Sequence, residues 1–320
     1  MLPEIHTWSE WGRVFTDAVL WAPAVREVCR QNHLPVTEIE AGYPGTNAVF
    51  IVDRRYVVKL FCPFCREDFA LETELYPLLA LDPRIPSPRL LGQGTLHDRI
   101  EWPYIVMSFI PGSPIRELRN RIPPENLLEI ARHLGEIVRA IHALPLTTLR
   151  ALDTSRAGWI GFLGSQQASL RERCREKTTL PEPCIDELVA LVSRTLAHEA
   201  ERPLVLVNGD LTEDHLLLVE EEERWRISGL IDFADAMVGA ADYEWPALWG
   251  SGLNGDPDCL RAFMSAYAPD QALSPEFVDR LLAYTCIHEF GPEIINDMLR
   301  RWDTPPPPSL EALRALFWNG

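Results

Sequence analysis

The sequence predicts an α+β protein with two lobes, a small β-rich first lobe and a larger helical second lobe. Short runs of β-branched and aromatic residues, separated by polar turns, occur within residues 37–107 and are typical of antiparallel strands. After Pro111 and Gly112 the pattern changes to amphipathic helices. The length of 320 residues is enough for two lobes. We therefore expect residues 1–108 to form the first lobe and residues 109–320 the second.

The first lobe should open with a helix over residues 8–30 that Pro23 bends or breaks. Its apolar side chains recur at helical spacing at Trp11, Phe15, Ala18, Val19 and Ala22. Two β-rich runs follow, Ala48–Val52 and Tyr56–Phe61, and the short polar turn between them predicts a hairpin. The remaining elements of this lobe are a helix over 66–80, which contains Pro77, and strands over 89–92 and 100–107.

The second lobe should combine long helices with a few short strands. Leu127–Ala143 is strongly amphipathic and predicts a long helix, and further helices are expected over 155–199. Three apolar runs should form strands, the third after an acidic turn: Leu204–Val207, Leu216–Val219 and Ile227–Phe233. The rest of the chain should be helical.

The composition indicates a folded protein that binds neither nucleic acids nor membranes. Hydrophobic residues make up 47% of the chain and charged residues 24%, as in ordinary globular proteins. The formal net charge is −17, for which solubility is the first interpretation. An acidic surface also repels phosphate backbones and attracts cations. The sequence contains neither an apolar run long enough to span a membrane nor the pattern of a signal peptide. We therefore expect a cytoplasmic protein with a small-molecule partner.

Among seven scattered cysteines, Cys62 and Cys65 have the CxxC spacing of a redox dithiol or of half a zinc site. The sequence offers no second CxxC to complete four metal ligands. The pair also follows a strand that contains a lysine, rather than the first strand of a βαβ unit. We expect structural thiols here. The alternative is a redox enzyme with a low-pKa thiolate.

A glycine-bearing turn and a lysine inside a strand are the first candidates for a functional site. Gly42, Gly45 and Asn47 lie in the turn before the hairpin, and glycine lets backbone N–H groups approach phosphate oxygens. Lys59 lies in an apolar strand, and a buried ammonium needs an anionic partner such as a carboxylate or a nucleotide phosphate. The alternative is a lysine on a solvent-facing side of the strand.

The helix over 66–80 offers a partner for this lysine. Glu72 lies closest to the apolar stripe of Leu75 and Leu79, so it should point toward the core and reach Lys59. Glu74 lies on a different side of the helix and should be solvated.

Two aspartates follow apolar runs in the second half of the chain. Asp210 comes after Leu204–Val207, and Asp232 lies at the end of the run Ile227–Phe233. One carboxylate can accept the proton of a nucleophilic hydroxyl group while the other holds Mg²⁺.

In their order and spacing these features resemble the aminoglycoside phosphotransferase family, which shares the protein-kinase-like fold with choline kinases. That family's loop reads His-Gly-Asp, followed by Asn at the position held here by His215. Its metal segment reads Ile-Asp-Phe/Trp, then Gly, then Tyr-Asp/Glu. The matching residues here are Asn208, Gly209, Asp210, Ile231, Asp232, Phe233, Gly239, Tyr243 and Glu244. Segments 106–112 and 134–145 are similar to that family's interlobe hinge and to its helix before the loop, so the resemblance covers about residues 38–250.

The resemblance implies transfer of the γ-phosphate of ATP or GTP to a hydroxyl group. The turn with Gly42, Gly45 and Asn47 would cover the nucleotide phosphates, Lys59 would bind them and Glu72 would orient Lys59. The backbone near Ser108, Phe109 and Ile110 would receive the base. Asp210 would be the base or orienting group for the acceptor hydroxyl. Asp232 would bind Mg²⁺, with Mn²⁺ as an alternative.

Two positions depart from the family pattern. Asn208 replaces a histidine that mainly braces the loop, so an amide can substitute. His215 replaces the second metal ligand, and imidazole suits Mg²⁺ poorly. His215 could bind Mn²⁺ or Zn²⁺, contact a phosphate when protonated, or leave one strong metal site. Glu213 and Asp214 are alternative oxygen donors.

Two functions remain open on this basis. The first is an ATP-dependent small-molecule kinase acting on a hydroxyl group of an aminoglycoside-type antibiotic, an amino sugar or an amino alcohol; on an antibiotic this is a resistance activity. Its candidate substrate-binding residues are Asp235, Glu244 and Trp245, with helix packing and capping as the alternative role for each. The second is a nucleotide-binding pseudokinase that acts as a regulatory or interaction module.

Overall fold

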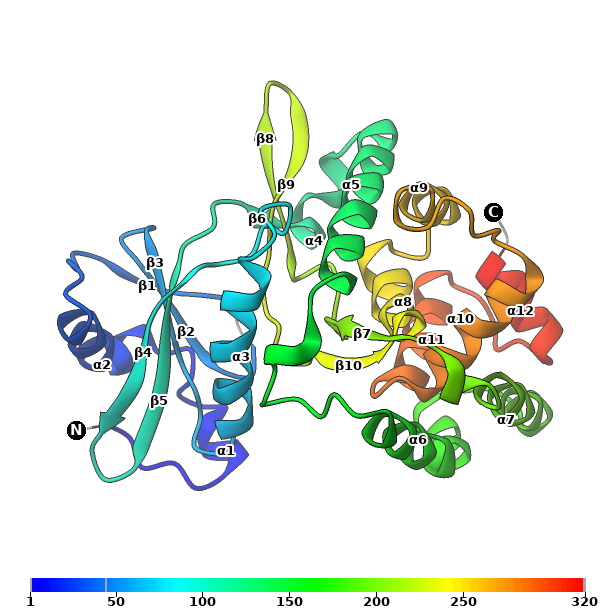
Figure 1. Cartoon of the computed structure of the whole chain (residues 1–320), viewed down its shortest axis with the longest axis horizontal. Helices are drawn as coiled ribbons and strands as arrows, with labels where there is room; N and C mark the ends of the chain where they lie inside the picture. The colour runs from blue at the N-terminus through cyan, green and yellow to red at the C-terminus, as the bar shows by residue number, and fades with distance from the viewer. Residues whose placement is uncertain (1, 44, 319–320) are drawn as a thin grey trace. The chain divides into compact units, whose positions relative to one another are not determined.

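The computed structural model describes residues 2–43 and 45–318, which divide into two compact units. The first unit contains the chain up to Gly112 together with Leu149–Ala151 and Ser228–Ala234. The second contains Ser113–Thr148, Leu152–Ile227 and the chain from Asp235 onward. Figure 1 shows their elements. Within the described residues, no helix has both the length and the apolar character needed to cross a membrane.

A five-stranded antiparallel sheet forms the framework of the first unit, in the order β1-β2-β3-β5-β4. Its strands are β1 (Ile39–Ala41), β2 (Ala48–Val52), β3 (Tyr56–Leu60), β4 (Leu90–His97) and β5 (Glu101–Ser108). The predicted hairpin is confirmed, with Val49 opposite Lys59. The predicted end of the fourth strand at residue 92 is wrong, because pairing with β5 continues to His97 beyond an irregularity in register at Leu90 and Gly92.

Three helices accompany this sheet: α1 (Trp8–Trp11), α2 (Ala18–Gln31) and α3 (Arg66–Leu79). The prediction of one helix over 8–30 is wrong, because the chain leaves the helix after Trp11. A new helix starts where the Asp17 carboxylate accepts hydrogen bonds from the N–H groups of Val19 and Leu20. Pro23 lies inside α2 and does not end it. The helix with Pro77 is confirmed as α3.

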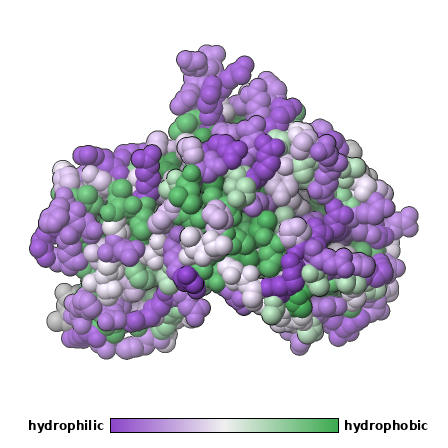
Figure 2. All heavy atoms as spheres, in the orientation of Figure 1, coloured by the Kyte–Doolittle hydropathy of each residue, from purple (hydrophilic) through white to green (hydrophobic). Residues whose placement is uncertain are grey.

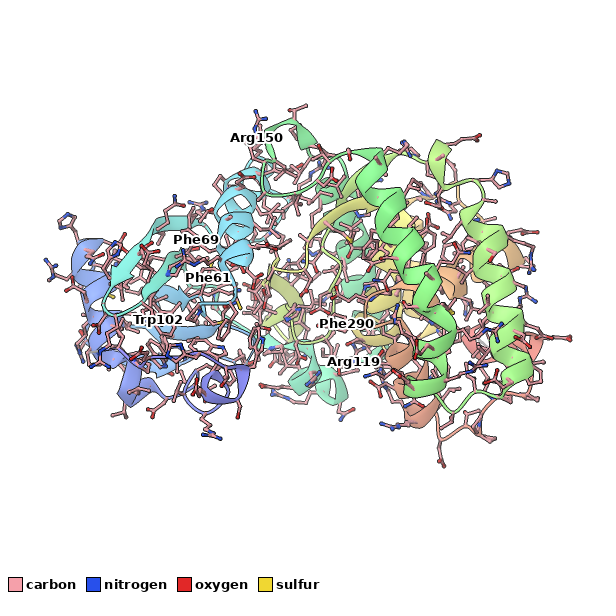
Figure 3. All side chains as sticks on the ribbon, turned by 90° about the horizontal axis from the view of Figure 1, so that it is seen from below. Phe61, Phe69, Trp102, Arg119, Arg150 and Phe290 are labelled. Atoms are coloured by element: carbon pink, nitrogen blue, oxygen red, sulfur yellow. The ribbon has the colours of Figure 1, made fainter. Side chains whose placement is uncertain are left out.

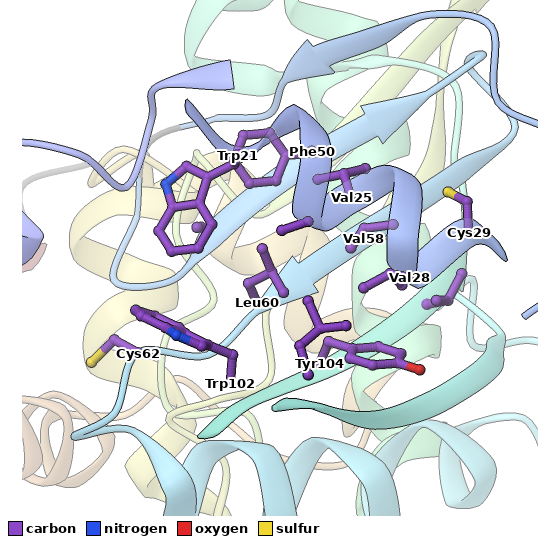
Figure 4. Packing of buried hydrophobic residues seen from close by; sticks show 14 of the residues in the cluster. Trp21, Val25, Val28, Cys29, Phe50, Val58, Leu60, Cys62, Trp102 and Tyr104 are labelled. Atoms are coloured by element: carbon purple, nitrogen blue, oxygen red, sulfur yellow. The ribbon is translucent and has the colours of Figure 1, made fainter. Parts of the chain in front are cut away.

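The two longer helices of the first unit lie on opposite sides of the sheet (Figure 1). Trp21 and Val25 of α2 pack in one apolar cluster with Phe50, Val58 and Leu60 (Figure 4). Successive side chains of a strand point to opposite faces. Because Val58 and Leu60 face α2, Lys59 between them faces α3.

Helices dominate the second unit, and their number and length bear out the predicted α+β class. They are α4 (Ile115–Leu118), α5 (Pro124–His142), α6 (Arg156–Lys177), α7 (Glu182–Leu196), α8 (Trp245–Ala247), α9 (Pro257–Tyr267), α10 (Pro275–Ile287), α11 (Gly291–Arg301) and α12 (Leu310–Trp318). The amphipathic run around Leu127–Ala143 is thus confirmed as α5. Gly135 lets α5 and α9 approach closely, because a Cβ there would lie 2.4 Å from the carbonyl oxygen of Phe263.

Two further small sheets are present in the described part of the chain. They are β7 (Leu204–Val207) with β10 (Met237–Ala240), and β6 (Ser113–Pro114) with β8 (Leu216–Glu221) and β9 (Arg224–Leu230). Left-handed backbone at Glu222 and Glu223 makes the β8–β9 turn, and hydrophilic residues cover this end of the hairpin (Figure 2). The third predicted strand stops at Leu230 rather than at Phe233, because Asp232 has a φ of 59° and cannot continue an extended strand.

Candidate functional site

A buried lysine between two carboxylates is the main polar feature of the first unit. Lys59 Nζ lies 2.5 Å from Glu72 Oε1 and 3.2 Å from Asp232 Oδ1. Glu72 comes from the buried side of α3, as its spacing predicts, and Asp232 follows β9. Lys59 and Glu72 are buried, whereas the side chain of Asp232 is 35% exposed. The solvent-facing alternative for Lys59 is therefore wrong, and the cluster opens to solvent at Asp232.

Burial and charge act in opposite directions on this lysine. Burial alone would lower the pKa of Lys59, but the charges of Asp232 and Glu72 outweigh it and raise that pKa above its ordinary value. Burial raises the pKa of Glu72 to about 7, against the opposing pull of Lys59. Lys59 Nζ also lies 5.5 Å from the ring centroid of Phe61, which packs edge-on against Phe69 (Figure 3). The ammonium therefore stays protonated at neutral pH in a buried setting of low dielectric constant, where it can bind anionic oxygens strongly.

The two glycines of the turn before β2 have different surroundings. The N–H of Gly42 donates to the carbonyl of Val49 at 2.7 Å, and a Cβ at Gly42 would lie 2.7 Å from Val49 Cγ1. At Gly45, by contrast, no described atom outside the chain neighbours lies within 4 Å of the position of a Cβ. The buried amide of Asn47 accepts from the Cys62 N–H at 3.4 Å and donates to Asp68 at 3.5 Å. Pro44, in the same predicted turn, lies outside the described residues.

The segment predicted to receive a nucleotide base follows β5. The N–H of Ser108 donates to Arg89 O at 2.9 Å, and that of Phe109 donates to Arg55 O at 3.0 Å. No described residue accepts a hydrogen bond from the N–H of Ile110. Of the three predicted residues, only Ile110 therefore keeps its backbone donor for a ligand, because Arg89 and Arg55 accept from the other two.

The loop after β7 carries Asp210 in the second unit. Gly209 has a φ of 78°, and a Cβ there would lie 2.7 Å from the carbonyl oxygen of Asp235. The side chain of Asn208 accepts a hydrogen bond from the Asp210 N–H at 3.0 Å, so Asn208 braces the loop as we expected of an amide. The Asp210 side chain is 23% exposed and can meet a ligand from solvent.

Glu244 holds the backbone of this loop. Its Oε2 accepts from the N–H of Asn208 at 2.8 Å, and its Oε1 accepts from the N–H of Gly209 at 3.2 Å. His142 of α5 lies 3.3 Å from Glu244 Oε2 through Nε2, and its Nδ1 lies 2.8 Å from the hydroxyl of Tyr267. A fully buried carboxylate thus takes two backbone donors of the loop that carries Asp210.

The predicted substrate-binding roles of Glu244 and Trp245 need correction. Glu244 is fully buried, and Trp245 is 2% exposed. Trp245 packs against the rings of His142, Phe263 and Tyr267. Neither side chain offers a surface to a substrate, so their packing role is the one that the structure supports. Asp235 is the exposed member of the predicted set.

His288 is a buried contact of the loop that the sequence did not indicate. Its Nε2 lies 2.9 Å from the carbonyl oxygen of Gly209, and its Nδ1 accepts from the N–H of Phe290 at 3.3 Å. Accepting at Nδ1 and donating at Nε2 defines the neutral tautomer. Burial lowers the pKa of His288 to about 4. The sequence does not indicate His142, because a histidine on the buried side of a helix fits the same periodic pattern as a core residue, nor His288, because it directly follows the apolar run of α10.

His215 contacts Asp210 itself. Its Nδ1 lies 2.8 Å from the Asp210 carbonyl oxygen and 3.3 Å from Asp210 Oδ2. Both contacts to Asp210 therefore involve Nδ1 and not Nε2. The alternative oxygen donors Glu213 and Asp214 both pair with Arg116. His215 is therefore better placed to orient Asp210 than to complete a set of metal ligands.

Among the described residues, no group of three His, Cys, Asp or Glu side chains could hold a metal ion alone. Mg²⁺ commonly binds through one or two carboxylates, with waters and substrate phosphates completing its shell. The partly exposed carboxylate of Asp232 fits such an ion, whereas the imidazole of His215 does not.

Glu74 has a structural role that the helical spacing did not reveal. Its helical position predicts a solvated side chain, but its Oε2 accepts hydrogen bonds from the N–H groups of Arg150 and Ala151 at 2.6 and 2.9 Å. The Glu74 carboxylate therefore links α3 of the first unit to a segment that follows α5 in the sequence.

Cys62 and Cys65 are free thiols in the interior, with their sulfur atoms 3.0 Å apart. Burial and the neighbouring Cys62 raise the pKa of the Cys65 thiol. A redox-active cysteine needs a lowered thiol pKa and access to solvent. Both thiols are buried and the pKa of Cys65 is raised, which favours the structural interpretation.

Comparison with known proteins identifies the family. Residues 35–277 match the model of the phosphotransferase enzyme family, which covers most of the chain. The chain belongs to this family. It is a phosphotransferase of the class that acts on hydroxyl groups, as the sequence motifs implied.

Solved structures show the same kinase-like fold. The GDP complex of wild-type aminoglycoside 2'-phosphotransferase-IIIa is 18% identical over 93% of this chain and 98% of that one, with a TM-score of 0.68. The GDP and kanamycin complex of APH(2")-IIIa is 19% identical over 88% of this chain and 93% of that one, with a TM-score of 0.66. The aminoglycoside-3'-phosphotransferase of type VIII is 24% identical over 84% of this chain and 98% of that one, with a TM-score of 0.56. At these identities the likeness confirms the predicted protein-kinase-like fold.

Proposed function

We propose that this phosphotransferase moves the γ-phosphate of ATP or GTP to a hydroxyl group of a small cationic molecule. The observation that carries the proposal is the cluster of Lys59, Glu72 and Asp232. It combines a buried, protonated ammonium with a partly exposed carboxylate 3.2 Å away. A triphosphate needs both, a cation for its oxygens and a carboxylate for the divalent ion that accompanies it.

Each remaining residue has a defined part in this proposal. Asp232 would hold Mg²⁺ or Mn²⁺, which would neutralise phosphate charge when bound. The open backbone at Gly45 would approach the phosphates, and the N–H of Ile110 would meet the base. Asp210 would accept the proton of the acceptor hydroxyl or orient that hydroxyl, while Asn208 and Glu244 keep its loop in place.

The net charge and the solved relatives support the proposed substrate class. A net charge of −17 attracts cations and raises their local concentration near the protein. Solved relatives include complexes with kanamycin and with gentamicin. These observations favour an aminoglycoside or another amino sugar over an anionic or neutral acceptor, and Asp235 offers an exposed carboxylate for such a substrate. Action on an antibiotic would make the chain a resistance enzyme.

The test is a phosphorylation assay with purified protein. ATP and GTP, each with Mg²⁺ or Mn²⁺, are offered with a panel of aminoglycosides, amino sugars and choline, and mass spectrometry detects an acceptor with one added phosphate. Replacing Asp210 by Asn should lower the rate at least about a hundredfold if Asp210 is the base. Equal turnover by wild type and D210N would remove Asp210 from the mechanism.

The pseudokinase alternative predicts a different outcome of the phosphorylation assay. It expects nucleotide binding in thermal-shift measurements with no phosphorylated acceptor. The brace from Asn208 to the Asp210 N–H weakens this alternative, because an intact loop is what catalysis requires. Changing His215 to Asn tests the other departure, since a large gain of activity with Mg²⁺ would show that the histidine handicaps the site.

A further inference from the structure

The segment before the family match contacts the glycine-bearing turn. The match begins at residue 35, so α1 and α2 lie outside it. A capping box starts α1, in which Thr7 Oγ1 accepts from the Glu10 N–H at 3.2 Å and Glu10 Oε2 accepts from the Thr7 N–H at 3.0 Å. This reciprocal pair fixes the single helical turn that ends in Trp11.

Trp11 joins the core of the first unit to that turn. It is 2% exposed, and its ring centroid lies 5.8 Å from those of both Trp21 and Trp102, which Figure 4 shows in the apolar cluster. Its indole N–H donates to the carbonyl oxygen of Thr46 at 2.7 Å. Thr46 itself is exposed, so a rigid donor anchored in the core holds the backbone of a surface turn.

The hydrogen bond from Trp11 to Thr46 lies between two parts of the turn that differ in their contacts. On its far side, the buried Asn47 is tied to Cys62 and Asp68. On its near side, Gly45 has no described packing partner at its Cβ position. Thr46 therefore separates the anchored end of the turn from the part that is open to a ligand.

We infer that Trp11 is a positioning residue for nucleotide phosphates, acting through its hydrogen bond to Thr46. The inference rests on the proposed function, because it needs the turn to cover those phosphates. Trp11 does not touch the nucleotide. It reduces the number of backbone conformations that the open part of the turn must give up on binding, which strengthens binding.

Trp21 provides a matched control. It is fully buried in the same cluster, and its indole N–H donates to the carbonyl of Val14 at 2.7 Å, away from the turn. Trp11→Phe and Trp21→Phe each remove one indole hydrogen bond and similar ring volume. Calorimetry with Mg²⁺ measures two dissociation constants for each protein. One is that of ADP or GDP, whichever binds wild type more tightly, and the other is that of the matching nucleoside without phosphates.

We expect W11F to lower the affinity for the nucleoside diphosphate roughly three- to tenfold, which corresponds to the free energy of one hydrogen bond. The affinity for the nucleoside should stay unchanged. W21F should change neither by more than about twofold. Equal diphosphate affinities for W11F and W21F would overturn the inference. So would an equal loss of diphosphate and nucleoside affinity in W11F, which would indicate general damage.

A second variant covers the case in which W11F does not fold. Thr7→Ala loosens the exposed cap of α1 and touches no core residue. It should lower the affinity for the diphosphate, but by a smaller factor than W11F does. Unchanged diphosphate affinity in T7A, with W11F unfolded, would count against the inference. Lys59→Met separates the two proposals. If wild type and K59M bind the diphosphate equally, or if wild type binds none, the proposed function fails and the positioning role fails with it.

Discussion

Glycine serves two purposes in the turn before β2. At Gly42 a side chain would collide with Val49, so the fold itself requires glycine. At Gly45 the described chain leaves the space empty. An empty space beside an exposed backbone has no value for stability. A ligand that covers the turn would meet this space, so a substitution at Gly45 tests binding separately from folding.

We expect Gly45→Ala to weaken nucleotide diphosphate binding at least about tenfold, because a methyl group would meet the incoming phosphates. The free energy of unfolding should change by less than about 0.5 kcal/mol. Calorimetry and urea unfolding measure the two effects.

Gly161 is the control, since it lies in α6 and also has open space at its Cβ. Gly161→Ala should stabilise the helix by about 0.5–1 kcal/mol and leave nucleotide affinity unchanged. If Gly45→Ala binds nucleotide as wild type does, the turn is not a phosphate site.

Among the elements, the loop after β7 depends on three helical segments. Glu244 ends a short 3₁₀ turn, Ala241–Glu244, His142 ends α5, and His288 follows α10. Glu244 takes two N–H groups of the loop, His288 meets a carbonyl of the loop, and His142 supports Glu244. The position of Asp210 is thus set from outside its own segment of chain.

Replacing Glu244 by Gln should lower kcat about 10- to 100-fold, because an amide has one acceptor oxygen and releases one of the two loop N–H groups. The dissociation constant of the nucleotide should change less than about twofold, since Glu244 acts on the loop and not on the Lys59 cluster. Steady-state kinetics and calorimetry give both numbers.

Glu199→Gln is the matched control for E244Q. Glu199 is another buried glutamate of the second unit, and it accepts from the indole N–H of Trp159 instead. If E199Q and E244Q lose the same share of kcat, the effect reports destabilisation rather than the loop.

The elements that the sequence predicted well are those with strong local signals. The hairpin at Ala48–Val52 and Tyr56–Phe61 has alternating apolar residues and a polar turn, and β7 matches its prediction to the residue. The break between α1 and α2 was missed because apolar spacing continues through it, while the cap at Asp17 depends on one side chain. The pairing of Lys59 with Glu72 followed from helix geometry. The burial of Glu244 did not, because it depends on partners that are far away in sequence.

At the scale of the whole molecule, stability should depend on pH through His288. Burial lowers its pKa to about 4 from the ordinary value of 6.5. Between these values the unfolded chain binds a proton that the folded protein excludes, so the contribution of His288 to stability is full above pH 6.5 and falls as the pH drops toward 4.

We expect this histidine to remove about 2 kcal/mol of unfolding free energy between pH 7 and pH 5. Urea unfolding followed by tryptophan fluorescence measures it at both pH values. His288→Gln keeps a donor for the Gly209 carbonyl but does not titrate, so its stability should fall about 2 kcal/mol less over the same range. An identical pH dependence in both proteins would show that His288 is not the source.

The first unit is discontinuous along the chain, and this bears on how the protein is made. Its sheet is complete at Ser108, but the carboxylate of Asp232 reaches Lys59 only after most of the second unit's sequence has been translated. Domains commonly begin to fold while the ribosome is still at work. A nascent chain that has formed only the sheet and α3 would hold Lys59 against Glu72 alone. The last contact that assembles the ammonium cluster is therefore a late event of biosynthesis, and a fragment ending near Gly112 would lack it permanently.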